Sequence, residues 1–186
     1  MCGWLDWPLS SIGESQLLSL DNEPSKFKPE TVYASSSSRA RLTAEALAAN
    51  WRVPVRIDPD LREINSGAME GMPIDEVKHR FPDLWLRNAA QDDSDFAWPE
   101  GETYRKFRER VFEALSRIAS RHSDARIPVV THTGVIAQVV GAMKGLSPAV
   151  WEQHRPAPLT ATEVIWSGAA PVQLLSFNVA HWWRRL

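Results

Sequence analysis

The chain has 186 residues, 44% of them apolar, enough for one core that buries roughly 70% of the unfolded surface, so we expect a single domain over residues 1–186. The 21 Lys and Arg against 23 Asp and Glu give a net charge of −2, which excludes an overall basic field for holding DNA or RNA. The single cysteine, Cys2, excludes a disulfide within the chain, and no apolar run approaches the roughly 18 residues that span a bilayer. Residues 1–6 carry no secretory signal pattern, and we expect a cytoplasmic protein.

Strands and helices alternate in the first half of the chain. Residues 31–34 have the apolar run of a buried strand, and residues 39–50 have the spacing of a helix. Residues 53–57 fit a second strand, and residues 74–81 fit a short helix that Pro82 ends. Two segments are rich in proline and charged residues and are predicted to be surface loops. They are residues 21–30 and 88–101.

The second half contains the clearest strand, turn and helix. Residues 104–120 have apolar side chains at helical spacing behind Thr103, which is placed to cap the helix. A strand at 127–130 leads through a turn into a helix at 135–144 that Gly145 closes. Two further strands are expected at 163–166 and 172–175.

This alternation predicts an α/β fold with a mainly parallel sheet covered on both faces. Ligands bind such sheets at the carboxyl ends of the strands, which here are the turns at 35–39 and 131–134. Arg39 would lie near a helix N-terminus, where backbone N–H groups and a guanidinium suit a phosphate. His132 would lie at a strand end and exchange a proton near neutral pH, and Glu63 with a raised pKa would serve as a general acid. Each residue alone also fits a purely structural role.

Short motifs occur in a fixed order along the chain. They are Gly3 to Gly13, Ser38 to Ala44, Leu61 to Gly71, Gly101-Glu102-Thr103 with Arg110-Val111, Thr131-His132-Thr133-Gly134, and Phe177-Asn178-Val179-Ala180-His181. Together and in this order they resemble the motifs of the histidine phosphatase superfamily, the phosphoglycerate mutase-like enzymes. The six matches span nearly the whole chain.

The resemblance implies a three-layer α/β/α sandwich of the phosphoglycerate mutase-like type. It implies that Arg39 clamps a phosphate, that His132 stabilises the transferring phosphoryl group and that Glu63 donates a proton to the leaving oxygen. The residues expected against substrate are Cys2, Gly3, Arg39, Thr133 and Gly134. The segment from Glu70 to Gly101 is short, which resembles the phosphatase branch more than the glycolytic mutases and favours hydrolysis.

One family motif has no counterpart in this sequence. The family opens with a strand ending in Arg-His-Gly, whose His accepts the phosphoryl group, and residues 1–186 contain no such triplet. A strand and loop of on the order of fifteen to twenty residues would be absent. We therefore expect an empty slot beside the strand at 127–130, and we interpret the recorded chain as starting too late, at an internal Met or from a truncated gene.

Three functions remain open at this point. The first is a phosphomonoester hydrolase that works through phosphohistidine, with activity impaired because the sequence lacks the nucleophilic histidine. The second is a non-catalytic module that binds a phosphorylated ligand. The third is a mutase-type phosphotransferase. A fourth alternative is the product of a degraded gene, which would fold poorly and have no specific function. We expect a phosphorylated small molecule as partner, neither nucleic acid nor membrane, and no cofactor or metal, because no cluster has ligand spacing. An unfilled sheet edge would favour a homodimer.

Overall fold

The computed structural model describes residues 1–20 and 28–180, which contain six α-helices, five strands and two 3-10 turns. The helices are α1 (Ser11–Leu18), α2 (Ser38–Trp51), α3 (Ile74–Arg80), α4 (Pro82–Ala90), α5 (Tyr104–Arg121) and α6 (Thr133–Met143). The strands are β1 (Val32–Ala34), β2 (Val55–Ile57), β3 (Val129–Val130), β4 (Ala161–Ser167) and β5 (Ala170–Val179), and the 3-10 turns are η1 (Pro59–Leu61) and η2 (Gly67–Met69). Within these residues, no helix combines the length and apolar character needed to cross a membrane.

The central sheet has three parallel strands in the order β2-β1-β3. Tyr33 of β1 lies opposite Val129 of β3, and Val32 lies opposite Val55 of β2. Because the strands are parallel, their carboxyl ends lie at one edge, where β1 leads into Ser35. This confirms the α/β fold with a parallel sheet that the alternating pattern predicts.

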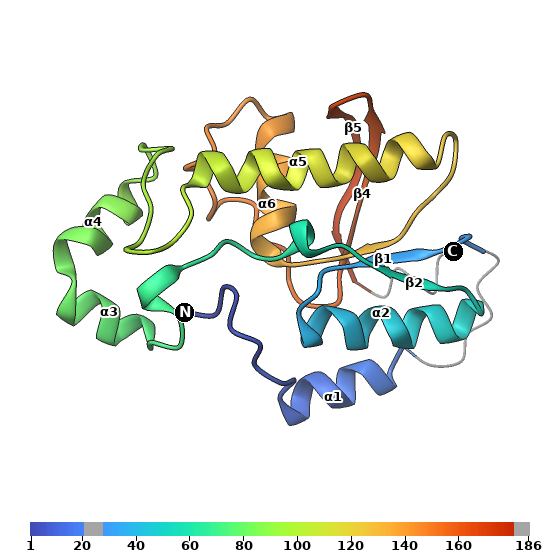
Figure 1. The fold of residues 1–186 in the computed structure, drawn as a ribbon, viewed down its shortest axis with the longest axis horizontal. Helices are drawn as coiled ribbons and strands as arrows, with labels where there is room; N and C mark the ends of the chain where they lie inside the picture. The colour runs from blue at the N-terminus through green and yellow to red at the C-terminus, as the bar shows by residue number, and fades with distance from the viewer. Residues whose placement is uncertain (21–27, 181–186) are drawn as a thin grey trace.

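The side chains of β1 alternate between two helical layers, which gives the three-layer arrangement in Figure 1. Val32 and Ala34 pack against Ala44 and Ala48 of α2 on one face. On the other face, Tyr33 packs against Leu61 and against Ala114 and Ile118 of α5. Helices α3 and α4 lie together at one end of the molecule, beside the N-terminus.

The last two strands form an antiparallel sheet of their own. Val164 and Trp166 of β4 pack against α5 and α6, and the Trp166 ring meets the Phe112 ring edge-on at 5.2 Å. Among the described residues, β3 pairs with β1 alone. This hairpin therefore packs on helices and does not continue the ladder of the parallel sheet.

Several predicted boundaries differ from the structure. Pro82 begins α4 as well as following α3, since proline suits the first position of a helix, so the loop expected from residue 88 begins only after Ala90. Helix α6 begins at Thr133, two residues earlier than predicted. The sequence analysis assigned no element to α1. Residues 21–27 of the expected loop and His181 of the closing motif lie outside the described residues.

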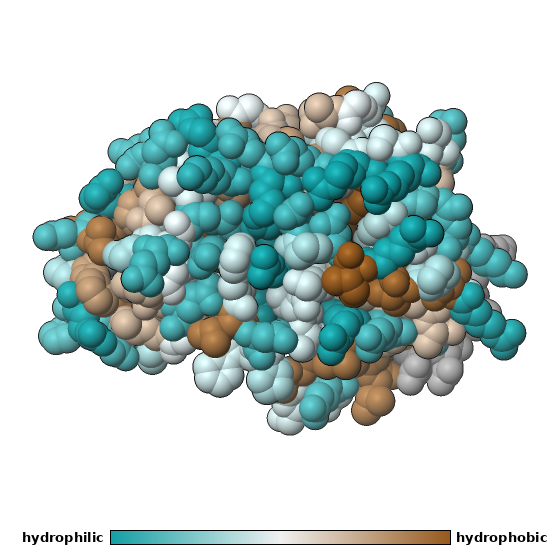
Figure 2. Space-filling view, viewed as in Figure 1, coloured by the Kyte–Doolittle hydropathy of each residue, from teal (hydrophilic) through white to brown (hydrophobic). Residues whose placement is uncertain are grey.

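The surface divides into polar and apolar regions. Figure 2 shows that the side of α5 facing the viewer is hydrophilic, whereas apolar side chains gather lower down, over the region of α1, α2 and β2. The exposed apolar residues of those elements are Ile12, Leu18, Leu42 and Ile57.

Candidate active site

Glu63 lies after η1, at the sheet edge where β3 ends. Its Oε2 accepts a hydrogen bond from the Gly134 backbone N–H at 2.8 Å, and its Oε1 accepts one from Ile64 N–H at 2.9 Å. Burial raises the pKa of the Glu63 carboxyl above its ordinary value, although these two donors and the charges of Arg39 and Arg155 oppose the rise. The carboxyl thus holds its proton to a higher pH than an exposed glutamate does.

His132 is buried and immediately precedes α6. Its Nε2 lies 2.8 Å from the Oγ of Ser35, which follows β1 and is fully buried. Burial lowers the pKa of His132 to about 3, and the positive charges of Arg39 and Arg110 act in the same direction. The imidazole is therefore neutral at physiological pH, with one nitrogen as donor and the other as acceptor.

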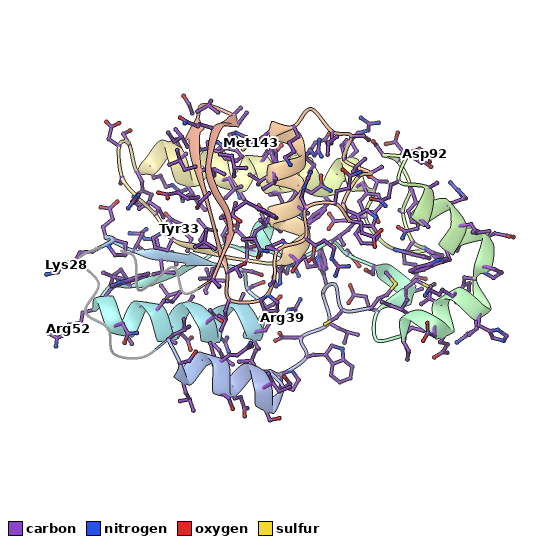
Figure 3. The ribbon with its side chains drawn as sticks, turned by 180° about the vertical axis from the view of Figure 1, so that it is seen from behind. Lys28, Tyr33, Arg39, Arg52, Asp92 and Met143 are labelled. Carbon is purple, nitrogen blue, oxygen red and sulfur yellow. The ribbon has the colours of Figure 1, made fainter. Side chains whose placement is uncertain are left out.

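Arg39 lies in the first turn of α2, at the end of the helix that meets the N-terminal segment (Figure 3). Its guanidinium donates to three backbone carbonyls of that segment: Leu5 O at 3.0 Å, Gly3 O at 2.9 Å and Cys2 O at 3.4 Å. Its charge influences the pKa of Glu63 and of His132. These three predicted residues therefore come together at one edge of the sheet.

The other predicted residues border the same place. Cys2 and Gly3 lie in the N-terminal segment that Arg39 binds, and the Cys2 thiol is exposed. Glycine is required at residue 3, because a Cβ there would overlap the Ile64 carbonyl. Thr133 begins α6, and the N–H of Gly134 already donates to Glu63, so in this structure Gly134 positions the Glu63 carboxyl.

Glu70 holds the N-terminal segment from the opposite side. Its carboxylate accepts hydrogen bonds from Trp4 N–H at 2.6 Å, Leu5 N–H at 2.5 Å and Ser66 N–H at 3.1 Å. Glu70 was not among the site residues predicted from the sequence. Together with Arg39, which binds the carbonyls of the same segment, it fixes residues 2–5 beside the site.

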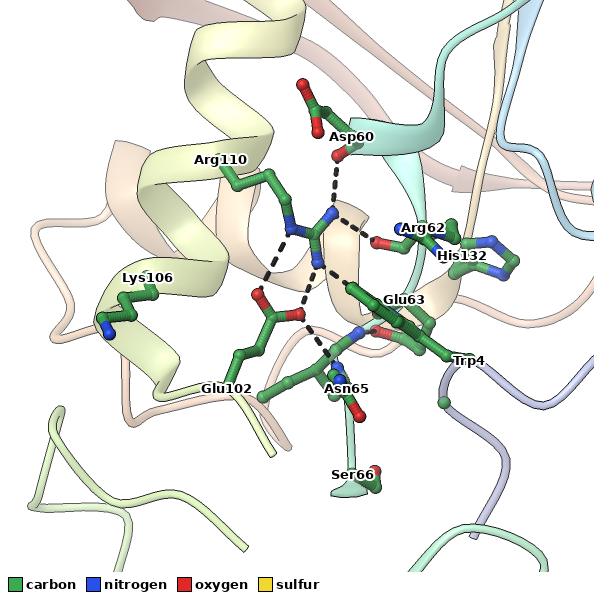
Figure 4. Close-up of polar contacts among 12 residues, drawn as sticks. Trp4, Asp60, Arg62, Glu63, Asn65, Ser66, Glu102, Lys106, Arg110 and His132 are labelled. Atoms are coloured by element: carbon green, nitrogen blue, oxygen red, sulfur yellow. Dashed lines mark hydrogen bonds and ion pairs between the residues drawn. The ribbon is translucent and has the colours of Figure 1, made fainter. Parts of the chain in front are cut away.

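Arg110 of α5 binds the backbone that carries Glu63 (Figure 4). Its guanidinium donates to Asp60 O at 2.7 Å, Arg62 O at 3.1 Å and Glu63 O at 3.3 Å, and it forms an ion pair with Glu102. Both side chains of this pair are largely buried. The sequence motifs contained Arg110 and Glu102, but their spacing in the chain does not reveal that they hold the loop that carries Glu63.

Sequence reasoning also missed Trp4 and Ser35. The Trp4 indole N–H donates to Glu63 O at 2.9 Å, and the Arg62 guanidinium lies 3.6 Å from the centre of its ring. Ser35 stands in a run of four serines, where nothing distinguishes the one that meets His132. The described residues contain no group of three or more His, Cys, Asp or Glu side chains arranged to hold a metal ion.

Comparisons with known proteins show which family and fold the chain matches. The histidine phosphatase superfamily (branch 1) matches residues 1–179. The chain is 36% identical over 137 residues to phosphoglycerate mutase-like protein 4 of Arabidopsis thaliana, covering 72% of this chain and 59% of that protein. It is 29% identical over 153 residues to the probable phosphoglycerate mutase GpmB of Escherichia fergusonii, covering 82% of this chain and 70% of that protein.

Solved structures share the fold. Bacillus stearothermophilus YhfR superimposes with a TM-score of 0.85 at 26% identity, covering 97% of this chain and 89% of that one. The mycobacterial glucosyl-3-phosphoglycerate phosphatase Rv2419c, in a structure with VO3, superimposes with a TM-score of 0.82 at 23% identity, covering 97% and 91%. At that identity the second likeness supports the fold alone.

Proposed function

The chain belongs to the histidine phosphatase superfamily (branch 1), and on that basis we propose that its site binds phosphomonoesters for hydrolysis, within a single domain. One arrangement carries the proposal: the Glu63 carboxyl accepts a hydrogen bond from the N–H of Gly134, two residues after the buried His132, and the charge of Arg39 acts on the pKa of both groups. Titratable groups whose pKa values are shifted by burial and by a neighbouring charge gather at functional sites.

Each group then has a distinct role. Arg39 attracts the phosphoryl oxygens, and its planar guanidinium suits their geometry. With the Ser35 hydroxyl donating to Nε2, His132 carries its proton on Nδ1 and donates it as a hydrogen bond to a phosphoryl oxygen. A water oxygen bonds to phosphorus as the P–O bond to the alcohol breaks, and protonated Glu63 gives its proton to the leaving alcohol oxygen. The resulting carboxylate recovers a proton from the water that completes hydrolysis.

The covalent route of the family needs a histidine that accepts the phosphoryl group. Among the described histidines, His132 alone lies at the site. His79 is exposed on α3, His122 contacts Glu30 and Tyr33, and His154 meets the Phe177 ring edge-on. We propose that residues 1–186 by themselves bind a phosphoryl group and turn it over slowly. The lack of an Arg-His-Gly triplet in this sequence equally favours a second candidate, a non-catalytic module that binds phosphorylated ligands.

Calorimetry with inorganic phosphate and orthovanadate tests the binding step in the 186-residue chain. We expect binding to the wild type, and a loss of affinity of about tenfold or more in Arg39→Ala, because charge-assisted hydrogen bonds are lost. Arg41→Ala is the matched control, since Arg41 lies on the same helix and pairs with Glu45 on the surface. Equal losses in both variants, or no binding by the wild type, would refute the proposal.

An assay with p-nitrophenyl phosphate separates the two candidates. Turnover that Glu63→Gln lowers, but Glu113→Gln on the exposed side of α5 does not, supports hydrolysis. Phosphate binding without any turnover supports the non-catalytic module.

A further inference from the structure

Trp4 belongs to the N-terminal segment that lies beside the loop carrying Glu63 (Figure 4). Its backbone N–H donates to the Glu70 carboxylate at 2.6 Å, which anchors the residue. Its indole N–H donates to the backbone carbonyl of Glu63 at 2.9 Å. One residue therefore connects the anchored segment to the peptide group that follows Glu63.

The Trp4 ring is not part of the core. It is 36% exposed and belongs to none of the buried apolar clusters that the described residues form. Its ring contacts are cationic instead, because the Arg62 guanidinium lies 3.6 Å from the ring centre and the Arg110 guanidinium 5.9 Å from it. Burial of apolar surface therefore does not explain why the indole N–H lies on the Glu63 carbonyl.

The peptide group between Glu63 and Ile64 transmits this contact to the carboxyl. Its carbonyl oxygen accepts from the Trp4 indole at 2.9 Å and from the Arg110 guanidinium at 3.3 Å. Its N–H, which is that of Ile64, donates to Glu63 Oε1 at 2.9 Å. Because a peptide group is planar, a donor that fixes its C=O also fixes the direction of its N–H. A hydrogen bond at the carbonyl also polarises the peptide and strengthens the bond that its N–H donates.

Other groups that act on the Glu63 carboxyl come from three sides. Gly134 at the start of α6 donates to Oε2 at 2.8 Å. Burial raises the pKa of the carboxyl, and the charges of Arg39 on α2 and Arg155 in the loop before β4 oppose this rise. Burial and the negative charge of Glu63 raise the pKa of Tyr104 on α5. Among the contacts of the described residues, the indole touches none of these groups, so its removal acts on the carboxyl through the peptide alone.

We propose that Trp4 is a positioning residue for Glu63, whose indole N–H orients the peptide group between Glu63 and Ile64 so that this peptide donates to the carboxyl. The inference rests on the proposed function, in which Glu63 delivers a proton, and adds a residue that controls how firmly Glu63 holds it. Without the indole N–H, the Ile64 N–H donates less strongly and the carboxylate loses part of its stabilisation. The pKa of Glu63 is then higher than in the wild type.

Carbon-13 NMR of the glutamate carboxyl groups tests the inference on the ligand-free 186-residue chain, with Glu63→Gln identifying the Glu63 signal. Trp4→Phe keeps an aromatic ring against Arg62 and loses the N–H donor. We expect this variant to lower the acid dissociation constant of Glu63 about two- to fivefold, the effect of one weakened hydrogen bond. Trp7→Phe is the matched control, because Trp7 lies in the same segment and is 52% exposed. It should leave the Glu63 titration unchanged.

Nitrogen-15 NMR of the tryptophan indole groups gives a second readout that needs no change at Trp4. One indole signal of the wild type should titrate with the same midpoint as the Glu63 carboxyl. Its transition should disappear in Glu63→Gln, which replaces the carboxyl by a neutral group of the same shape. In Trp4→Phe the signal itself should be absent.

The inference is overturned if no indole signal follows the ionisation of Glu63. It is also overturned if Trp4→Phe shifts the Glu63 titration no further than Trp7→Phe does. Both titrations are made without ligand, so either result leaves the proposed function standing as long as the wild type binds inorganic phosphate. A wild type that binds no inorganic phosphate overturns the proposed function, whatever the titrations give.

Discussion

The Gly134 backbone N–H donates to the Glu63 carboxylate at 2.8 Å, and the same carboxyl group fills the space beside that glycine. A Cβ at residue 134 would lie 2.8 Å from Glu63 Cδ, closer than packed carbon atoms approach. A side chain at residue 134 would therefore displace the Glu63 carboxyl from this position.

Gly134→Ala should displace the Glu63 carboxyl without unfolding α6. Alanine favours a helix over glycine by about 1 kcal/mol, so this gain offsets part of the cost of the steric clash. We expect a lower affinity for phosphate and a changed pH dependence of binding, measured by calorimetry beside the melting temperature. Gly141→Ala is the matched control in the same helix, where a Cβ meets its nearest neighbour at 3.6 Å. If both variants bind phosphate equally well, Gly134 has no positioning role.

His132 should make the fold sensitive to acid. Its pKa is about 3 in the folded chain against 6.5 ordinarily, so the unfolded chain binds more protons between these values. The contribution of His132 to stability is complete above pH 6.5 and is lost as the pH falls toward 3, by roughly 1.4 kcal/mol per pH unit. Urea unfolding between pH 7 and 4 should show a shallower loss for His132→Gln, whose amide still reaches Ser35. Parallel curves for the two proteins would contradict this assignment.

Glu63 should make the folded chain less stable as the pH rises, which is the opposite of the effect of His132. Burial raises its pKa above 4.5, so the folded chain holds the proton more tightly than the unfolded chain does. Its contribution to stability is complete below pH 4.5 and is lost as the pH rises through the folded-state pKa. We therefore expect Glu63→Gln to gain stability relative to the wild type as the pH increases from 4 to 8. A difference in unfolding free energy that stays constant over this range would show that Glu63 ionises equally in both states.

Local patterns predicted most of the elements because each pattern reports on a few neighbouring residues. The apolar spacing of residues 104–120 and the cap at Thr103 predict α5, and Thr103 Oγ1 does accept from Lys106 N–H at 3.1 Å. Helix α1 was missed because its apolar residues do not form a single face and none of them is buried. The separate hairpin was missed because a strand pattern does not state which edge the strand joins.

The residues of the site likewise fall into those that local patterns predict and those that only the folded chain reveals. Arg39, Glu63 and His132 were found because each follows a strand or belongs to an ordered motif, and the rule for parallel sheets places strand ends together. Ser35 and Arg110 act through contacts with residues 97 and 47 positions away in the chain, namely His132 and Glu63. Such long-range pairs leave no periodic signal in one sequence, so only the folded chain reveals them.

Arg110 bears on stability and on the site together, because one guanidinium binds three carbonyls and the Glu102 carboxylate. Arg110→Met leaves Glu102 largely buried without its partner, and breaking a buried ion pair in this way costs about 3–5 kcal/mol. Adding Glu102→Gln removes the unpaired charge, so the double variant should be more stable than Arg110→Met alone.

In both of these Arg110 variants the carbonyls of Asp60 and Arg62 lose their guanidinium donor and Glu63 O keeps only the Trp4 indole N–H, so both should bind phosphate weakly. Urea unfolding and phosphate calorimetry measure the two effects separately. Arg105→Lys is the control, because Arg105 pairs with Asp95 on the surface and should leave the unfolding midpoint and the affinity unchanged. A double variant that regains both stability and wild-type phosphate affinity would show that Arg110 only balances the charge of Glu102 and does not position the loop that carries Glu63.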